Sequence, residues 1–188
     1  MTTSTLPSAT TQTFVIDPDH SEVGFHVRHL LSRTRGRFAR FSGTIALDRQ
    51  QPERSHIRFE VEAASIDTRQ PDRDAHLRSG DFFEVERFPV IRFESTAIRA
   101  LGGEHYAVDG VLSLRGIDKP LTLAVDWFGV AKDPWGNERA GFRTEAVIDR
   151  KEFGMVWNAA LDNGGFILGD EVTVTIDLET IAQPGPTA

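Results

Sequence analysis

The chain has 188 residues, no cysteine and a formal net charge of −7 at pH 7. The lack of cysteine excludes disulfides, thiolate nucleophiles and cysteine-based metal sites. The negative charge disfavours nucleic acid and anionic membrane surfaces as partners. The length favours a single domain with a substantial core, and 13 Phe against 1 Tyr suit an apolar interior.

The two ends of the chain are poor in apolar residues. The first twelve residues are rich in Thr and Ser and lack the basic and apolar segments of a secretory signal. No run of about 18 apolar residues is present for a membrane-spanning helix. The sequence therefore predicts a soluble, cytoplasmic protein with tails at residues 1–12 and 182–188 and one domain at residues 13–181.

Alternation of apolar and polar residues predicts an all-β protein, because a half-buried strand repeats every two residues. The clearest alternation lies at residues 22–28, 57–63, 121–127 and 172–178. Further strands are expected at residues 13–17, 38–48, 90–98, 106–115 and 141–149. Eight or nine strands with Gly-rich turns are typical of a barrel or a sandwich, and a barrel leaves no exposed edge. A bend is expected between Phe38 and Phe41, which cannot share one face of a regular strand.

Residues 68–83 interrupt the strand pattern. Pro71 followed by acidic residues predicts a short helix that ends at Gly80. The segment mixes Arg, Asp and His side chains and finishes on Phe82 and Phe83. Polar groups beside an aromatic pair suggest where an amphipathic ligand enters a barrel. The alternative is a set of internal ion pairs that hold the helix on the barrel rim.

Candidate site residues follow from the two patterns. The pore is expected to be lined by Phe25, Phe59, Val61, Phe93, Leu123, Val125, Trp127, Val174 and Ile176. The mouth is expected at Phe82, Phe83 and Trp157. Arg73, His76 and Arg78 are the candidates for a polar headgroup, because guanidinium and imidazole groups bind polar and phosphorylated ligands. No catalytic residue and no metal ligand is assigned.

Other functions stay open at this point. His76 with Asp74 could act as an acid–base pair on a small hydrophobic substrate. A solid core without a cavity would instead indicate a structural or protein-interaction domain. The run Asp17–Ser21 reads as a turn more readily than as a catalytic cluster.

Two further polar groups have simple interpretations. His26 and His29 are an odd number of residues apart on a strand, which argues against a metal site with His20. Asn158, Asp162 and Asn163 precede a Gly-Gly pair and predict a flap or a wide hairpin.

Several sequence blocks in one order carry a family resemblance. They include I-D-P-D-H-S-E-V-G-F-H-V-R-H-L at residues 16–30, R-D-A-H-L-R-S-G-D-F-F at 73–83 and D-R-K-E-F-G-M-V-W-N at 149–158. Together they span about residues 13–181 and resemble the YceI-like family, a lipocalin-like group of polyisoprenoid-binding proteins.

The resemblance implies an extended eight-stranded antiparallel barrel whose apolar pore holds a long isoprenoid chain, such as a polyprenyl tail or an isoprenoid quinone. It further implies a homodimer, no required cofactor and no enzymatic activity. Many members of the family are exported, so the cytoplasmic location expected here departs from their pattern.

Overall fold

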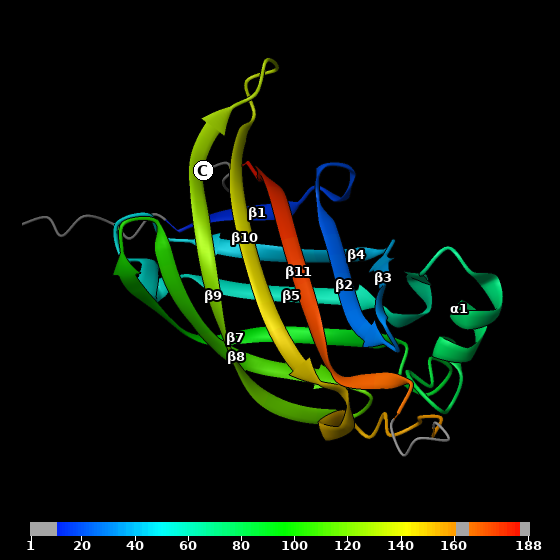
Figure 1. Ribbon diagram of the computed structural model, residues 1–188. Coiled ribbons are helices and arrows are strands. Elements are labelled where there is room, and N and C mark those ends of the chain that lie inside the picture. Colours follow the sequence, from blue (N-terminus) through cyan, green and yellow to red (C-terminus); the bar gives the residue numbers. More distant parts are fainter. Residues whose placement is uncertain (1–10, 161–165, 185–188) are drawn as a thin grey trace, which may run out of the picture.

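The computed structural model describes residues 11–160 and 166–184 and is built around one antiparallel sheet (Figure 1). The strands are β1 (Gln12–Ile16), β2 (Glu22–His29), β3 (Ser32–Phe38), β4 (Phe41–Leu47), β5 (His56–Glu62), β6 (Ile66–Asp67), β7 (Val90–Gly102), β8 (His105–Leu114), β9 (Ile117–Lys132), β10 (Glu138–Asp149) and β11 (Leu168–Ala182). The helices are α1 (Pro71–Arg78) and the short 3₁₀ turns η1 (Pro18–His20), η2 (Pro52–Arg54), η3 (Ala63–Ser65) and η4 (Arg150–Phe153).

Eight of the strands form a closed ring. The order is β1–β4–β5–β7–β8–β9–β10–β11, and β11 pairs back to β1. The eight-stranded antiparallel barrel predicted from the sequence is therefore confirmed. Strand β1 begins at Gln12, the last residue of the predicted N-terminal tail.

The ring forks at β11, which has two partners on one side. Its last residues pair with β1, and its earlier residues pair with β2. Strands β2, β3 and β6 thus extend the sheet at one end of the barrel. The polar strand β3 and the two-residue β6 were not predicted. The expected bend is confirmed, since β3 ends at Phe38, β4 begins at Phe41, and Ala39 N donates to Ser65 O at 3.1 Å.

Helix α1 lies at the forked end, beside β6 (Figure 1). Pro71 occupies the first turn, and the Gln70 side chain caps the helix by accepting from Arg73 N. The helix ends at Arg78 with Ser79 as its C-cap, one residue before the Gly80 that was expected to end it. In the described chain β6 pairs only with β3, and the helix contacts this last strand of the fork.

The opposite end of the barrel is filled by side chains. Phe14 is completely buried there and packs with Ile45, Leu47 and Ala140. Phe128 and Trp135 on the β9–β10 hairpin, which projects past this end, are exposed (Figure 1). One end of the barrel is therefore plugged, and the other carries the helix.

We predict that Phe14→Ala lowers the free energy of unfolding by about 3–5 kcal/mol, because it opens a cavity inside the plug. Urea denaturation followed by tryptophan fluorescence measures the change. The matched control Trp135→Ala removes a side chain that is 82% exposed, and surface changes of this kind stay within about 0.5 kcal/mol. Equal stabilities for Phe14→Ala and wild type would contradict the packed plug.

Candidate functional site

The barrel encloses a cavity of about 660 Å³. Eight of the nine residues predicted for the pore line it, and they come from both the fork and the closed ring. They are Phe25, Phe59, Val61, Phe93, Leu123, Val125, Val174 and Ile176. The solid-core alternative is therefore wrong, because side chains packed at interior density would leave no such space.

Trp127, the ninth predicted residue, does not line the cavity. It has the same strand parity as Leu123 and Val125, but it lies next to the β7–β8 turn, where its backbone N–H donates to Glu104 O at 2.8 Å. Its ring instead meets Tyr106 edge-on, with centroids 6.2 Å apart. Alternation identified the correct face of β9, but β9 runs on past the cavity.

Two glycines help to keep the aromatic rings against the wall. A Cβ at Gly36 would lie 2.4 Å from the Phe25 ring, and a Cβ at Gly110 would lie 2.4 Å from the Phe93 ring. Each ring therefore lies over backbone that carries no side chain. This arrangement leaves the middle of the barrel open although it is rich in phenylalanine.

Polar lining residues gather at the helix end of the cavity. They come from β2, β3, α1, η4 and the residues before α1. The members of this group are His29, Thr34, Thr68, Gln70, Asp72, Arg73, His76 and Arg150. Away from this end the lining is apolar apart from Arg143 and Thr144 on β10. The cavity is thus amphipathic along its length, with a polar mouth and an apolar interior.

Aromatic side chains form part of the mouth. His76 lies edge-on to Phe82 at 5.1 Å and to Trp157 at 4.7 Å between ring centroids. Phe82 and Trp157 are 5.6 Å apart. Phe82, Phe83 and Trp157, the three residues expected at the mouth, all line the cavity.

The headgroup candidates divide into two groups. Arg73 and His76 line the cavity. The Arg73 guanidinium donates to Thr68 Oγ1 at 2.7 Å and to Thr68 O at 2.8 Å. These bonds use two of its five N–H groups, so donors remain for a ligand.

Arg78 does not line the cavity, which corrects its expected role. Its guanidinium donates to Ala64 O at 2.8 Å and to Ile66 O at 2.7 Å. Ala64 lies within the η3 turn and Ile66 directly follows it, where the strand ladder is interrupted and backbone acceptors need other donors. Arg78 therefore holds the helix on the barrel rim, as the alternative interpretation of this segment expected, although its partners are backbone carbonyls and not carboxylates.

His76 and Asp74 do not form the acid–base pair that an enzyme hypothesis would need. Asp74 is 7% exposed and accepts from Thr68 N at 2.9 Å and Thr68 Oγ1 at 2.5 Å. His76 Nε2 instead lies 2.8 Å from Asp81 Oδ2. Asp74 lies in the first turn of α1, and its carboxylate binds the backbone N–H and the hydroxyl of Thr68, which precedes the helix.

Arg150 was not predicted as a site residue, yet it builds one wall of the mouth. It is 3% exposed and donates to Gly169 O at 2.9 Å, Met155 O at 2.5 Å and Trp157 O at 2.8 Å. Burial lowers the pKa of its guanidinium, and the carboxylate of Asp170 opposes that effect. The sequence gives no signal for this role, because two of the carbonyls belong to irregular backbone just after η4 and the third to the start of β11, which no helix or strand pattern brings together.

His29 is a second residue that the sequence interpretation missed. It lies on the same face of β2 as Phe25 and Val27 and lines the cavity, while the even-numbered His26 is not among the lining residues. The parity of β2 could have identified it. The same parity separates His26 from His29, as expected.

Asn158 joins the two sides of the segment before β11. Its amide group donates to Leu168 O at 2.7 Å and accepts from Leu168 N at 3.0 Å. Asp162, Asn163 and the Gly-Gly pair of the predicted flap lie outside the described residues.

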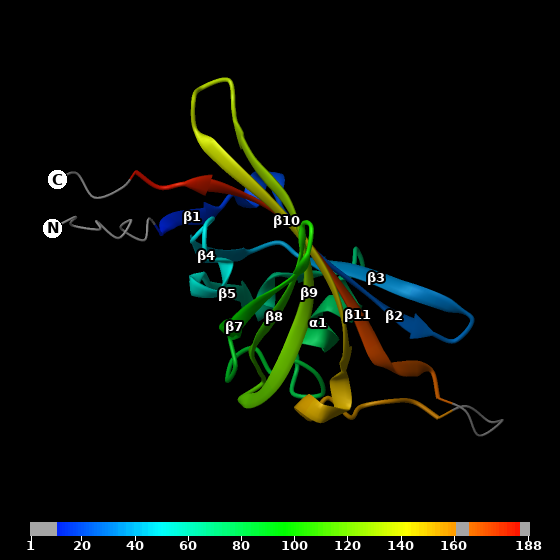
Figure 2. The ribbon, with the colours of Figure 1, turned by 90° about the vertical axis from the view of Figure 1, so that its left-hand side faces the viewer.

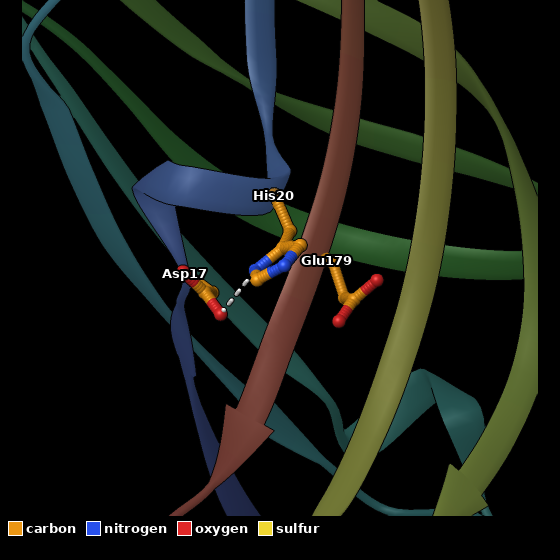
Figure 3. Close-up of side chains that lie close together, drawn as sticks. All are labelled: Asp17, His20 and Glu179. Carbon is orange, nitrogen blue, oxygen red and sulfur yellow. Dashed lines mark hydrogen bonds and ion pairs between the residues drawn. The ribbon is translucent and has the colours of Figure 1, made fainter. Parts of the chain in front are cut away.

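Asp17, His20 and Glu179 gather where β1, η1 and β11 meet (Figure 3). His20 Nδ1 is 2.9 Å from Asp17 Oδ2. Arg139 Nη1 lies 2.7 Å from Asp17 Oδ2 and 2.6 Å from Glu179 Oε1, so a guanidinium already supplies the positive charge between the carboxylates.

The run Asp17–Ser21 forms a turn, as predicted. Asp17 caps η1 by accepting from Asp19 N. Ser21 Oγ donates to Glu179 O at 3.2 Å and accepts from Glu179 N at 2.9 Å. The hydroxyl is therefore engaged by the backbone of β11 and is not in a catalytic arrangement with His20.

Arg139 connects this turn to the β9–β10 hairpin through Asp133, whose Oδ2 lies 2.9 Å from Arg139 Nε. Hydrogen bonds from the Asn137 side chain and then from Arg139 lower the pKa of Asp133 to about 2. The bond from Arg139 is the main reason that the pKa of Asp17 lies below its ordinary value.

The family comparison matches almost the whole length of the barrel. The model of the YceI-like domain family matches residues 14–180. The chain belongs to the YceI-like family. It is 38% identical to the UPF0312 protein of Azotobacter vinelandii over 145 residues, which cover 76% of each chain.

Solved structures share the YceI-like fold. BcnA of Burkholderia cenocepacia has a TM-score of 0.76 at 24% identity, and the match covers 87% of this chain and 98% of BcnA. A polyisoprenoid binding domain from Saccharophagus degradans, implicated in plant cell wall breakdown, has a TM-score of 0.67 at 15% identity, covering 93% of this chain and all of that domain. No helix in the described parts of this YceI-like chain is long and apolar enough to cross a membrane.

We predict that Arg139→Met weakens the acid resistance of the fold. The folded-state pKa values of Asp17 and Asp133 lie below the ordinary value of 3.8, so their stabilisation is complete above about pH 5 and is lost as the pH falls toward 2. Without Arg139 these pKa values rise, and the stability gained between pH 2 and pH 5 becomes smaller. Urea midpoints across that range measure the difference, and a variant whose midpoints run parallel to wild type would contradict the link.

Proposed function

We propose that this YceI-like protein binds and sequesters or carries a long-chain polyisoprenoid lipid, either a polyprenyl lipid or an isoprenoid quinone, in the barrel cavity. The observation that carries the proposal is a cavity of about 660 Å³ whose interior is apolar and whose polar groups gather at one end. Its volume lies in the range of roughly 300–1,000 Å³ that is typical of small-molecule sites.

The chemistry of an isoprenoid tail matches this interior. Such a tail exposes only carbon and methyl branches, and its burial is favourable by about 25 cal/mol per Å² of apolar surface removed from water. A wall of Phe, Val, Ile and Leu side chains supplies that burial without leaving polar groups unpaired. Only the head of the lipid then needs hydrogen bonds.

The length of the cavity also favours an elongated ligand. On β11 the lining residues run from residue 168 to residue 178. Ten residue steps of about 3.3 Å give roughly 33 Å along the strand. A strand tilt of about 40° reduces this to roughly 25 Å along the barrel axis, which suits an extended chain better than a compact molecule.

The head of the lipid would lie at the mouth, with Arg73 and His76 as its polar partners. Both line the cavity at its polar end, and Arg73 keeps N–H donors beyond its two bonds to Thr68. The aromatic contact between His76 and Trp157 places an apolar surface beside these donors. A quinone carbonyl or a prenyl phosphate would each suit this combination.

A binding role is supported further by the shared fold with the Saccharophagus degradans domain, which is described as polyisoprenoid binding. We infer a binding protein rather than an enzyme, because the mouth pairs His76 with the half-exposed Asp81 and engages Asp74 with Thr68. No cofactor is required by this proposal. The homodimer and the cytoplasmic location stay predictions.

We predict that native mass spectrometry of freshly purified protein shows a co-purified lipid. Its mass would distinguish an isoprenoid quinone from a prenyl phosphate. A clean protein mass, together with no uptake of added prenyl quinone or prenyl phosphate, would contradict the proposal.

We predict that Ala146→Trp blocks the cavity. Ala146 lines the interior on β10, so an indole there takes up space that the tail needs. Each displaced methylene costs about 0.8 kcal/mol of burial, so the loss of two lowers affinity by more than about tenfold. Ala124→Trp is the matched control, because Ala124 is exposed on β9.

Titration with a fluorescent prenyl ligand measures both variants, and urea denaturation shows whether each is folded. A folded Ala146→Trp protein that binds as wild type does would exclude the cavity as the binding site.

A further inference from the structure

The β2–β3 hairpin has an unusual turn. It projects beyond the barrel on the side where the chain leads into β11 (Figure 2). The turn residues between the strands are Leu30 and Leu31, and Leu31 is fully exposed. Leu30 has a φ of 51°, a conformation that two-residue hairpin turns normally give to Gly or Asn. The turn therefore departs from what the fold alone favours, which is typical of a functional constraint.

The outward face of the same hairpin is basic. Arg28 pairs with Arg33 across the strands, and His26 pairs with Arg35. The intervening positions, such as Phe25, point into the barrel. Among the described residues no carboxylate lies within ion-pair distance of Arg28, Arg33 or Arg35, whereas Arg37 has Asp67 at 3.4 Å. The hairpin is thus a cationic surface on a protein of net charge −7.

Other exposed apolar side chains lie beside the turn. Leu30 N donates to Ile167 O at 2.8 Å, which brings the turn next to the exposed Phe166. Lys151 Nζ lies 6.0 Å from the centre of the Phe166 ring and 2.8 Å from Asp170. Trp157, exposed by about a third, belongs to the same side and also lines the mouth. Apolar tips and basic flanks therefore surround the polar end of the cavity.

We propose that the β2–β3 hairpin docks on the surface of an anionic lipid bilayer. Leu30 and Leu31 would enter the boundary between headgroups and acyl chains, and the three unpaired arginines would meet the phosphates. A nucleic acid or an acidic protein would match the charge but would offer no apolar phase to the leucines. This proposal departs from the expectation that the overall charge disfavours anionic membranes, because three arginines gather on one hairpin of a protein that is negative overall.

Docking in this orientation places the mouth toward the bilayer. Exchange of lipid between bilayer and cavity then becomes possible, and that consequence rests on the proposed function. The docking surface itself does not depend on it, because it is defined by residues outside the apolar interior.

Flotation of the full chain with vesicles tests the docking. We expect binding to vesicles of phosphatidylglycerol with phosphatidylcholine, little binding to phosphatidylcholine alone, and weakening as salt is raised. The double variant Arg28→Gln/Arg33→Gln should lower partitioning by roughly thirtyfold, since each arginine near an anionic surface contributes about a factor of five. Its control, Arg54→Gln/Lys132→Gln, removes the same charge from exposed positions elsewhere and should leave partitioning nearly unchanged.

The leucines are tested separately by Leu30→Gly/Leu31→Ser. Gly suits the positive φ at position 30, so this variant should fold at least as well as wild type while it loses vesicle binding. Trp135→Ser is the control, because it removes an exposed aromatic side chain from the β9–β10 hairpin tip at the other end of the barrel.

Binding to heparin, a polyanion without an apolar phase, is measured beside vesicle binding. Three results would overturn the docking: wild type does not bind anionic vesicles, the hairpin variants bind vesicles as wild type does, or the hairpin variants lose heparin binding but keep vesicle binding. The last result would assign the hairpin to a polyanionic partner.

Loading of a prenyl quinone from detergent micelles reports on the cavity alone. A protein that docks but never loads would contradict the proposed function, and one that loads but never docks would contradict only this inference.

Discussion

Closure of the sheet through β11 is the constraint on which the rest of the structure depends. This strand pairs with β10 along one side and with β1 and then β2 along the other, so it has hydrogen-bonding partners on both sides. Because the ring is closed by backbone bonds, the interior does not have to be filled to hold the wall together. The Asp17–Ser21 turn bridges the two halves of the fork, and its bonds to Glu179 keep them in register.

The hollow interior follows from how the large side chains are distributed within that ring. Phe14 and its neighbours plug one end, while Phe25 and Phe93 lie against glycines in the wall. At the other end the sheet is interrupted, so backbone carbonyls near η3 and η4 need donors, and Arg78 and Arg150 supply them. The same interruption that requires these arginines creates the opening of the cavity.

The forked end therefore combines three properties in one place. The mouth has polar groups, its rim has exposed aromatic and aliphatic side chains, and the β2–β3 hairpin beside it is basic. A net charge of −7 does not reveal this arrangement. Among the described residues Arg28, Arg33 and Arg35 on the hairpin lack carboxylate partners, while many other arginines have them. The proposed docking therefore rests on the distribution of charge rather than on the total charge.

The sequence by itself determined the eight strands of the ring and β2, with their buried faces, because a pleated strand alternates its side chains strictly and needs no distant contact to do so. That local rule placed Val174 and Ile176 inside, and where the alternation breaks, Pro71 with the acidic residues after it predicted the helix. Only the tertiary structure decided where the cavity stops at Trp127, which carboxylate faces His76, and that Arg78 and Arg150 serve backbone carbonyls. Those outcomes depend on pairing register and on how the turns around α1 and η4 fold, which no periodicity within one strand encodes.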